Sequence, residues 1–455
     1  MATPRPFLPV TFAAVAATGL LLAGCQAGAS GIPPSGAAGS PTASAATTTP
    51  GTAPTSSQPT TAPPTTAAPS GTPAVTQPPS ATASTAASGS ATPTIVVAPS
   101  GNDGAAGTLA APFATVQHAV SVAQPGSVIA LRAGVYQPTA KIGITVSGTA
   151  AKPITLTSYG SEHAVLDGSK LSSGDKLIIT KGSYWDFDRL ELRNSPQQAL
   201  YAQSVTHTVF RRLDIHDNHN TGLDLTGAGA SDNLIENIDS HGNHDDVTKG
   251  QNADGIGIKF GSGAGNVVRD VRVFDNADDG IDLWEFSSPV TIEGSWSYGN
   301  GVNRWNISGF EGNGNGFKLG GGSSGSIPSV GHVVQNNASW DNTGTGFTEN
   351  GNPGPLQISS DTAYANGSAG FYFKLSSATL RANLSVANAT SASIGGSATA
   401  TGNSWSLGSY SASSFVSVDA TKATGARAVD GSLPAAGGFL RLVSNPHSLG
   451  ATLAG

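Results

Sequence analysis

The sequence predicts an all-β fold, a right-handed parallel β-helix whose open end is covered by an N-terminal capping helix. Three observations predict this architecture. Strand-like runs recur at short intervals, and each follows a turn that contains Asn and then Gly. Apolar and polar residues alternate after each Gly, as in strands with one buried face. An amphipathic stretch with helical spacing precedes the first run.

The turn asparagines set the period of the predicted stack. They are separated by 25, 33, 24, 42, 24 and 22 residues, and they are Asn218, Asn243, Asn276, Asn300, Asn342, Asn366 and Asn388. A basal period of 22 to 25 residues indicates stacked β-coils, in which the longer intervals carry loops. Asn at a fixed corner can hydrogen-bond to its equivalents in the neighbouring coils. Leucine-rich repeats share this period, but they need a Leu/Asn consensus and helical segments that are missing from this sequence.

The two ends of the repeat are predicted from the loss of its pattern. Residues 112–123 place apolar side chains at helical spacing, which predicts an amphipathic helix that closes the N-terminal end. We expect residues 127–136 to form the first strand. Residues 401–455 lose the period, and we expect them to pack along the side of the stack or to cap its far end.

The N-terminal segment is predicted to be a leader followed by a linker. Residues 1–25 contain Arg5, an apolar run and the ending Leu-Ala-Gly-Cys, which resembles a bacterial lipobox. Cys25 is therefore the expected lipidation site, with ordinary secretion and an incidental Cys as the alternative. Residues 26–93 carry no charge and are rich in Ala, Thr, Pro, Ser and Gly, which predicts a disordered linker. The folded domain is then expected at 94–455.

Composition limits the possible partners and the location. The formal net charge of −7 argues against nucleic acid as a partner. The single Cys excludes a disulfide within the chain. We expect a monomer on the bacterial cell surface, or released from it, whose only contact with a membrane is the N-terminal lipid anchor.

Aligning the coils on the Gly after each turn arranges the residues in columns. The positions one and three residues after the Gly are mostly apolar and should point inward, with Glu349 as the exception. The position two residues after the Gly should point outward, and it is occupied by Asp224, Gly257, Asp282, Lys318, Thr348 and Tyr372. Because adjacent strands lie about 4.8 Å apart, Asp282 and Lys318 should be neighbours on one outer face.

Four carboxylates from two successive coils should converge beside this pair, namely Asp254, Asp278, Asp279 and Asp282. Crowded carboxylates raise one another's pKa unless a cation shares their site. Ca²⁺ suits such a cluster better than Mg²⁺, because its oxygen coordination is flexible. A solvated set of Asp-Gly turns or a purely structural calcium cluster explains the spacing about as well.

Four segments make the sequence recognisable. In this order, NADGIGIKF, NADDGIDLWE, PVTIEGSWSYGNG and GNGNGFKLGG closely resemble the calcium-dependent pectate lyases of polysaccharide lyase family nine. The resemblance extends over most of 94–455 and implies a right-handed parallel β-helix that cleaves polygalacturonate, an acidic plant polysaccharide, by β-elimination. It also implies a catalytic Ca²⁺ held by Asp254, Asp278, Asp279 and Asp282, and a Brønsted base at Lys318.

The chemistry of β-elimination requires these residue types. Removing the C5 proton of a uronate leaves negative charge on its C6 carboxylate, which Ca²⁺ would stabilise as a Lewis acid. The base must be neutral to accept the proton, and a nearby dication lowers the pKa of a lysine. We therefore expect an alkaline activity optimum.

Two departures from the family pattern leave the identity of the polymer open. Ile281 stands where an aromatic residue is more usual, and Glu349 lies in the run Thr-Glu-Asn, where the family tends to carry polar residues of the DQNN kind. A Glu near the groove would disfavour an anionic chain. Rhamnogalacturonan or another uronate polymer therefore remains an alternative substrate.

Three further cations are candidates for binding substrate carboxylates: Lys259, Lys374 and Arg304. The two lysines lie four residues after the aligned Gly, and solvated strand lysines explain them about as well. Arg304 belongs to the insertion 302–314, and loops beside a groove often shape subsites.

Four histidines resemble a zinc site at first sight. His216 and His241, like His219 and His244, are 25 residues apart, which is one coil. We therefore expect them to be stacked equivalents rather than metal ligands.

A function of a different class also fits the sequence. A non-catalytic β-helix adhesin or carbohydrate-binding protein could keep calcium for stability. An outward lysine beside the carboxylates favours the lyase, because a binding module has no need of a base there.

Overall fold

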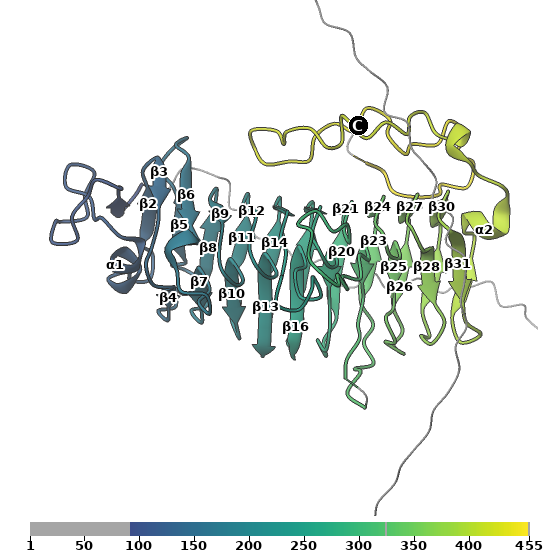
Figure 1. The fold of residues 1–455 in the computed structure, drawn as a ribbon, viewed down its shortest axis with the longest axis horizontal. Coiled ribbons are helices and arrows are strands. Elements are labelled where there is room, and N and C mark those ends of the chain that lie inside the picture. Colours follow the sequence, from purple (N-terminus) through teal and green to yellow (C-terminus); the bar gives the residue numbers. More distant parts are fainter. Residues whose placement is uncertain (1–91, 324, 454–455) are drawn as a thin grey trace, which may run out of the picture. The chain divides into compact units, whose positions relative to one another are not determined.

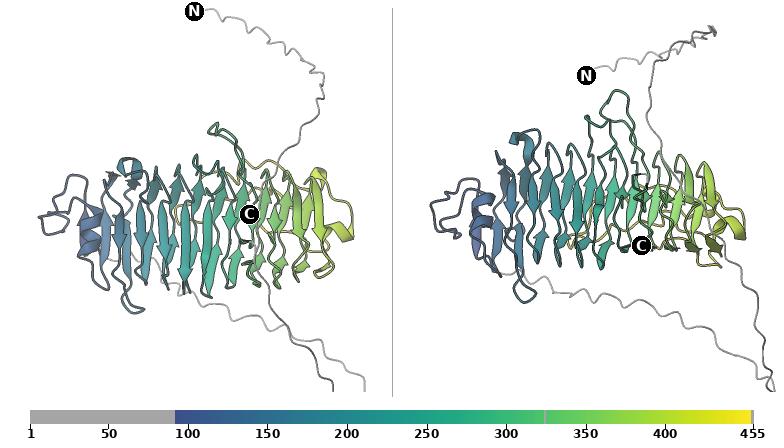
Figure 2. Two further views of the ribbon diagram at one scale, coloured as in Figure 1. Left: turned by 60° about the horizontal axis from the view of Figure 1, so that its bottom comes forward. Right: turned by 90° about the horizontal axis from the view of Figure 1, so that it is seen from below.

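The computed structural model describes residues 92–323 and 325–453, which form a stack of β-coils (Figure 1). Each complete coil contributes one strand to each of three sheets, and neighbouring strands are parallel. Figure 2 shows the coils following one another along the axis, from the blue N-terminal end to the yellow C-terminal end. The predicted signal segment 1–25 with Cys25, and the linker 26–93 except for its last two residues, lie outside the described residues. In the described residues, no helix has the length and apolarity needed to cross a bilayer.

The three sheets A, B and C each run the length of the described stack. Sheet A consists of β1 (Ile95–Val97), β2 (Val128–Leu131), β5 (Ile154–Ser158), β8 (Trp185–Asp188), β11 (Val209–Arg211), β14 (Leu234–Glu236), β17 (Asn266–Arg269), β20 (Val290–Glu293), β23 (Val333–Gln335), β26 (Gln357–Ser359), β29 (Thr379–Arg381) and β32 (Thr399–Thr401). Sheet B consists of β3 (Gly134–Tyr136), β6 (Ala164–Asp167), β9 (Glu191–Arg193), β12 (Asp214–His216), β15 (Asp239–His241), β18 (Arg272–Phe274), β21 (Trp296–Tyr298), β24 (Ala338–Trp340), β27 (Thr362–Tyr364) and β30 (Leu384–Val386). Sheet C consists of β4 (Ile142–Ile144), β7 (Ile178–Thr180), β10 (Leu200–Gln203), β13 (Leu223–Ala228), β16 (Ile256–Ser262), β19 (Ile281–Asp282), β22 (Phe317–Lys318), β25 (Phe347–Thr348), β28 (Ala369–Phe373) and β31 (Thr390–Ile394).

The N-terminal end is closed by the expected helix, which is shorter than its apolar pattern. Helix α1 (Val116–Ser121) buries Val116, Ala119 and Val120, and the Thr115 hydroxyl accepts a hydrogen bond from the His118 N–H at 3.1 Å. The prediction of the first strand was wrong. Strand β1 precedes residues 127–136 and pairs with β2, and residues 127–136 themselves contain β2 and β3, because the chain turns between them from sheet A to sheet B.

The asparagine ladder lies at the corner between sheets B and C, and its prediction is confirmed. Each carboxamide from Asn218 to Asn366 donates from Nδ2 to the Oδ1 of the next asparagine, at 2.8–3.0 Å, and the series ends at Asn388. The side chains therefore hold successive coils in one register along this corner. Inside the stack, the rings of Phe317, Phe347 and Phe371 continue the same register, with centroids 4.7 and 5.0 Å apart.

The C-terminal segment packs along the side of the stack, which was one of the two expected arrangements. After β32 the chain forms α2 (Ser404–Leu407) and runs back over sheet B (Figure 1, yellow). Phe415, Phe439 and Leu442 pack with Trp296 and Trp340 of sheet B in a second apolar cluster. This segment therefore covers apolar side chains that a β-helix would otherwise expose.

A second polar ladder lies at the corner between sheets A and B. In this ladder an aspartate, Asp361, stands between two asparagines, Asn337 and Asn383. Asp361 Oδ1 accepts hydrogen bonds from the N–H and Nδ2 of Asn337 at 2.8 and 3.0 Å, and the Asp361 N–H donates to Asn383 Oδ1 at 2.9 Å. Asp361 Oδ2 is buried without a hydrogen-bond partner in the described residues. Burial raises the pKa of Asp361 to about 8. The folded protein therefore keeps this carboxyl protonated under conditions where the unfolded chain ionises it.

Asp361→Asn should stabilise the protein at neutral and alkaline pH. Because the folded pKa is raised, wild-type stability is full below about pH 4 and falls as pH rises to about 8, at ~1.4 kcal/mol for each unit of pKa shift. The variant restores an Nδ2 donor and removes this loss. Denaturant unfolding at acidic and alkaline pH checks it, with Asn383→Asp as the reciprocal control that should steepen the fall. A variant less stable than the wild type at alkaline pH would contradict the assignment.

Candidate active site

The predicted outward column exists as one continuous register on sheet C. Asp224 pairs with Gly257, Gly257 with Asp282, Asp282 with Lys318, Lys318 with Thr348 and Thr348 with Tyr372. Asp282 on β19 and Lys318 on β22 are therefore direct neighbours. Both point away from the apolar core, yet only 3% of Asp282 and 6% of Lys318 is exposed. The charges of this column are consequently held in a site with little solvent.

Three of the four predicted carboxylates, including Asp282 itself, come together next to Lys318. One oxygen each from Asp254, Asp279 and Asp282 lies within 4.8 Å of the others. All three residues are buried, so the alternative of solvated Asp-Gly turns is wrong. Asp278 is buried close by but lies outside this trio, and its Oδ1 accepts a hydrogen bond from the Asn313 N–H at 2.7 Å.

Hydrogen bonds from the loops before each strand orient the trio. The Thr221 hydroxyl donates to Asp254 Oδ2 at 3.0 Å. The N–H and Nδ2 of Asn315 donate to Asp279 Oδ1 at 2.7 and 2.8 Å. The other oxygen, Asp279 Oδ2, is buried and lies 2.9 Å from Lys318 Nζ. One oxygen of this carboxylate is thus fixed by the fold and the other faces the cluster.

Two lysines contact the trio from different coils. Lys318 Nζ lies 2.9 Å from Asp279 Oδ2 and 3.3 Å from Asp282 Oδ2. Lys259 Nζ lies 2.5 Å from Asp254 Oδ2 and 3.8 Å from Asp282 Oδ2. The interpretation of Lys259 as a solvated strand lysine is therefore wrong, because its side chain folds back over the strand into the cluster.

Gly257 makes room for this fold of the Lys259 side chain. A Cβ at position 257 would lie 2.8 Å from Lys259 Cε and 3.3 Å from Asp224 Oδ1. The aliphatic part of the Lys259 side chain therefore occupies the space that Gly257 leaves free in the outward column. Asp224, one coil earlier, is buried, and burial raises its pKa to about 6, with the Lys259 charge acting in the opposite direction.

Burial and neighbouring charges shift the pKa values of the site residues. Burial raises the pKa of Asp282 to about 7, although the Lys318 charge acts to lower it. Burial also raises the pKa of Asp278, and the charges of Asp279 and Asp254 add to this effect. For Lys318, burial alone would lower the pKa, but the charges of Asp279 and Asp282 outweigh it and the pKa is raised. A nearby dication would act in the opposite direction to these carboxylates.

The donor set of the trio fits a hard divalent cation. Its oxygens are carboxylate oxygens, the preferred ligands of Ca²⁺, and Asp279 Oδ2 faces the cluster with the Lys318 Nζ cation 2.9 Å away. Burying three carboxylates is costly unless cations compensate their charge. The residues that could hold Ca²⁺ are therefore Asp254, Asp279 and Asp282, with Asp278 behind them.

The remaining predicted site residues lie outside the contacts of the cluster. Lys374 is exposed and lies over the Tyr372 ring, two coils beyond Lys318. Arg304 pairs with Asp275 at 2.6 Å and donates to the Gly299 carbonyl oxygen at 2.9 Å, at the corner after sheet B.

Glu349 does not lie where it would repel an anionic substrate. Its side chain is fully buried and accepts hydrogen bonds from the backbone N–H groups of Lys374, Leu375 and Ser376 at 2.7–2.9 Å. It therefore stabilises a turn of the next coil and does not face a groove. Ile281 is likewise fully buried in the inward column, so neither departure places an unfavourable group on the outer face.

Sequence reasoning did not assign three residues that the structure places at the site. They are Asp224, Asn315 and Trp284, whose ring centroid lies 5.1 Å from Lys318 Nζ. Asp224 and Asn315 belong to the aligned columns beside the Gly, so the column pattern held a signal for both. Trp284 follows strand β19, where alternation no longer specifies direction.

The histidine pairs are adjacent in successive coils, as expected. His216 and His241 stack with centroids 5.1 Å apart and ring planes 5° apart. His219 and His244 are also neighbours, 4.4 Å apart, but their planes differ by 51°. The second pair therefore departs from the parallel stacking of the first.

Comparison with known proteins identifies the family. The family model described as "Pel9A-like, right handed beta helix region" matches residues 95–388. Pectate lyase PEL9 of Emericella nidulans is 39% identical over 77% of this chain and 92% of its own length. Pectate lyase L of Dickeya dadantii is 35% identical over 77% of this chain and 83% of its own length.

Solved structures agree with the fold. The crystal structure of pectate lyase Pel9A has a TM-score of 0.70 and 33% identity, over 78% of this chain and 90% of that one. A rhamnogalacturonan lyase has a TM-score of 0.69 at 23% identity, over 79% of this chain and 99% of that one, which shows the fold alone. The prediction of a right-handed parallel β-helix is confirmed, and the chain belongs to the Pel9A-like right-handed β-helix family.

Proposed function

We propose that this protein is a polysaccharide lyase that cleaves pectate by calcium-assisted β-elimination, with Lys318 as the base. An enzyme of the pectate lyase type follows from its family, since relatives 35–39% identical over most of the chain carry that name. The observation that carries the mechanism is the pairing of Lys318 with Asp282, one member of the buried carboxylate trio. It supports a site where a cation and a base act on one sugar residue.

Each residue of the site has its own proposed role in the reaction. Asp254, Asp279 and Asp282 would hold Ca²⁺, which when bound neutralises the uronate carboxylate and stabilises the charge that develops there. Lys318 Nζ, in its neutral form, accepts the C5 proton. Asp279 and Asp282, which would hold the ion, keep Nζ within 2.9 and 3.3 Å of their carboxylates, and the Trp284 ring lies beside it with its centroid 5.1 Å away. The leaving oxygen at C4 then departs as the C4–C5 double bond forms.

Incubating the protein with polygalacturonate and Ca²⁺ should produce the ultraviolet absorbance of unsaturated uronides. Lys318→Ala and Lys318→Arg should each lower the rate on the order of 10²–10⁴-fold, because arginine keeps the charge but cannot release its proton to act as a base. Lys374→Ala is the matched control, since Lys374 is an exposed lysine that directly follows β28 of the same sheet; it should raise KM at most and leave kcat unchanged.

Three outcomes of this assay would reject parts of the proposal. A folded protein inactive on pectate but active on rhamnogalacturonan would transfer the mechanism to another polymer. A folded protein inactive on all uronates would leave a carbohydrate-binding role. Wild-type turnover in Lys318→Arg would exclude this lysine as the base.

The rate should rise with pH into the alkaline range. The carboxylates raise the pKa of Lys318, so the neutral form that accepts a proton is scarce at neutral pH and increases as pH rises. The pH dependence of kcat measures this directly. An optimum in the acidic range, in a protein that stays folded, is incompatible with a lysine base.

For its location, we propose that the protein is exported and anchored to the cell surface by a lipid on Cys25. The support is the sequence alone, a leader ending in Leu-Ala-Gly-Cys followed by an uncharged linker. Cys25→Ser should move the protein from the membrane fraction to the soluble fraction in a bacterial host. If the variant and the wild type distribute alike, the anchor is not at Cys25.

A further inference from the structure

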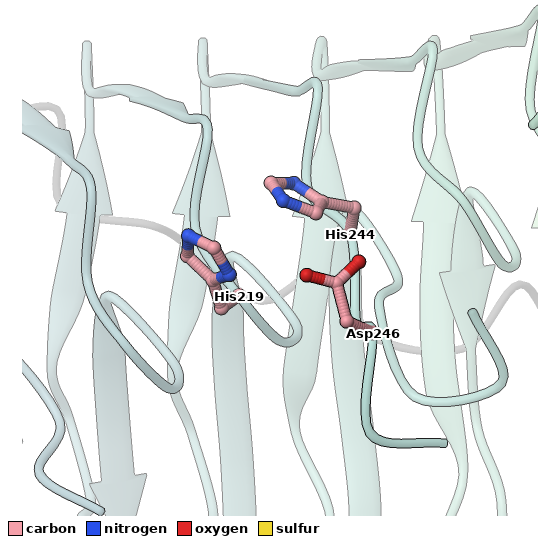
Figure 3. A group of neighbouring side chains, drawn as sticks. All are labelled: His219, His244 and Asp246. Atoms are coloured by element: carbon pink, nitrogen blue, oxygen red, sulfur yellow. The ribbon is translucent and has the colours of Figure 1, made fainter. Parts of the chain in front are cut away.

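A second group of potential metal ligands lies at the corner between sheets B and C. His219 follows β12, while His244 and Asp246 follow β15, one coil later, on the loop that leads to Asp254. One ligand atom from each of His219, His244 and Asp246 lies within 4.8 Å of the others. Figure 3 shows the three side chains pointing toward a common space. Two coils thus contribute to one cluster of imidazoles and a carboxylate.

The orientation of His244 is set by a contact outside the histidine ladder. The ring planes of His219 and His244 differ by 51°, whereas those of His216 and His241 differ by 5°. His244 instead stacks on Trp305, with centroids 4.8 Å apart and planes 11° apart. The insertion 302–314 therefore holds the His244 ring turned away from parallel stacking with His219.

The His244 ring also has an unsatisfied atom. Its Nδ1 is buried and has no hydrogen-bond partner in the part of the chain that the structure describes. Leaving such a nitrogen unpaired costs free energy. Burial, together with the neighbouring His219, lowers the pKa of His244 against the opposing charge of Asp246, which favours the neutral form that binds metals.

The backbone around Asp246 is fixed by its neighbour. The Asp245 carboxylate accepts hydrogen bonds from the N–H groups of Val247 and Thr248 at 2.8 and 3.1 Å. Asp246 is exposed at the same turn. Its carboxylate can therefore rotate without disturbing the loop.

We propose that His219, His244 and Asp246 form a binding site for a transition-metal dication of the Zn²⁺ type. Two imidazoles and a carboxylate are a donor set that Zn²⁺ takes, with a water completing the tetrahedron. Ca²⁺ takes oxygen ligands, so this site is chemically distinct from the carboxylate trio. Bonds of ~2.0–2.1 Å require ligand atoms closer than those of the structure, which rotations of the exposed His219 and Asp246 side chains supply.

A metal at this position would link two successive coils at the start of the Asp254 loop. Because the ion binds only the folded arrangement, it should raise the temperature of unfolding. The ladder of Asn218 and Asn243 fixes the backbone on both sides, since these asparagines are hydrogen-bonded at 2.9 Å. The loop that presents Asp254 would then be held by both the ladder and the ion.

Equilibrium dialysis against Zn²⁺, followed by metal analysis, tests the site. The full chain should be used without a histidine tag, in excess Ca²⁺ to occupy the carboxylate trio, and with Cys25→Ser to remove the single thiol. We expect one Zn²⁺ per chain and a higher unfolding temperature with zinc. His219→Ala and His244→Ala should each lose the bound zinc and the thermal shift, and Asp246→Asn should weaken both.

The matched control is His207→Gln. His207 is another exposed histidine with an aromatic neighbour, Tyr184, and a carboxylate, Asp232, 4.0 Å away, but it is not part of the cluster. This variant should bind zinc like the Cys25→Ser parent. Asp246→Asn changes only an exposed side chain, so its result does not depend on refolding of the core. Absence of zinc binding in the parent, or undiminished binding in both His219→Ala and His244→Ala, would overturn the proposal.

Discussion

The fixed register between neighbouring coils is the constraint on which the rest of this structure depends. Parallel pairing places each residue beside its equivalent in the next coil, about 4.8 Å away. Backbone hydrogen bonds alone would allow one coil to shift its register against the next. The ladder from Asn218 to Asn388 prevents this shift, because each asparagine side chain is hydrogen-bonded to its equivalent in the next coil. Residues that are 36 positions apart, such as Asp282 and Lys318, therefore become direct neighbours.

This register also explains how so many charges can be buried together. The carboxylates of Asp254, Asp279 and Asp282 come from adjacent coils, and two lysines enter the same cluster from β16 and β22. A lone buried carboxylate would shift its pKa and become neutral, whereas paired charges can remain ionised. The fold thus brings opposite charges close together on one outer face, as the proposed cation-assisted proton transfer requires.

The register could be predicted from the sequence because both of its signals are periodic. The asparagine spacing predicted the length of each coil. The alternation after the Gly predicted which side chains point inward and outward, and it predicted that Asp282 and Lys318 are neighbours. The contacts of long polar side chains could not be predicted in this way. Lys259, within β16, folds back across Gly257 into the cluster, and the inward-pointing Glu349 binds backbone N–H groups of the next coil. These contacts depend on local turns and on neighbouring coils, which period and alternation do not encode. The same limit applies to residues 127–136, where a change of sheet interrupts a continuous apolar pattern.

The most direct test of the central claim is a crystal structure determined with Ca²⁺, with the ion located by its anomalous scattering. The account predicts one ion bound at about 2.3–2.6 Å by carboxylate oxygens of Asp254, Asp279 and Asp282, next to Lys318 on the following coil. An ion bound elsewhere on the stack, with Lys259 and Lys318 still paired to these carboxylates, would contradict it.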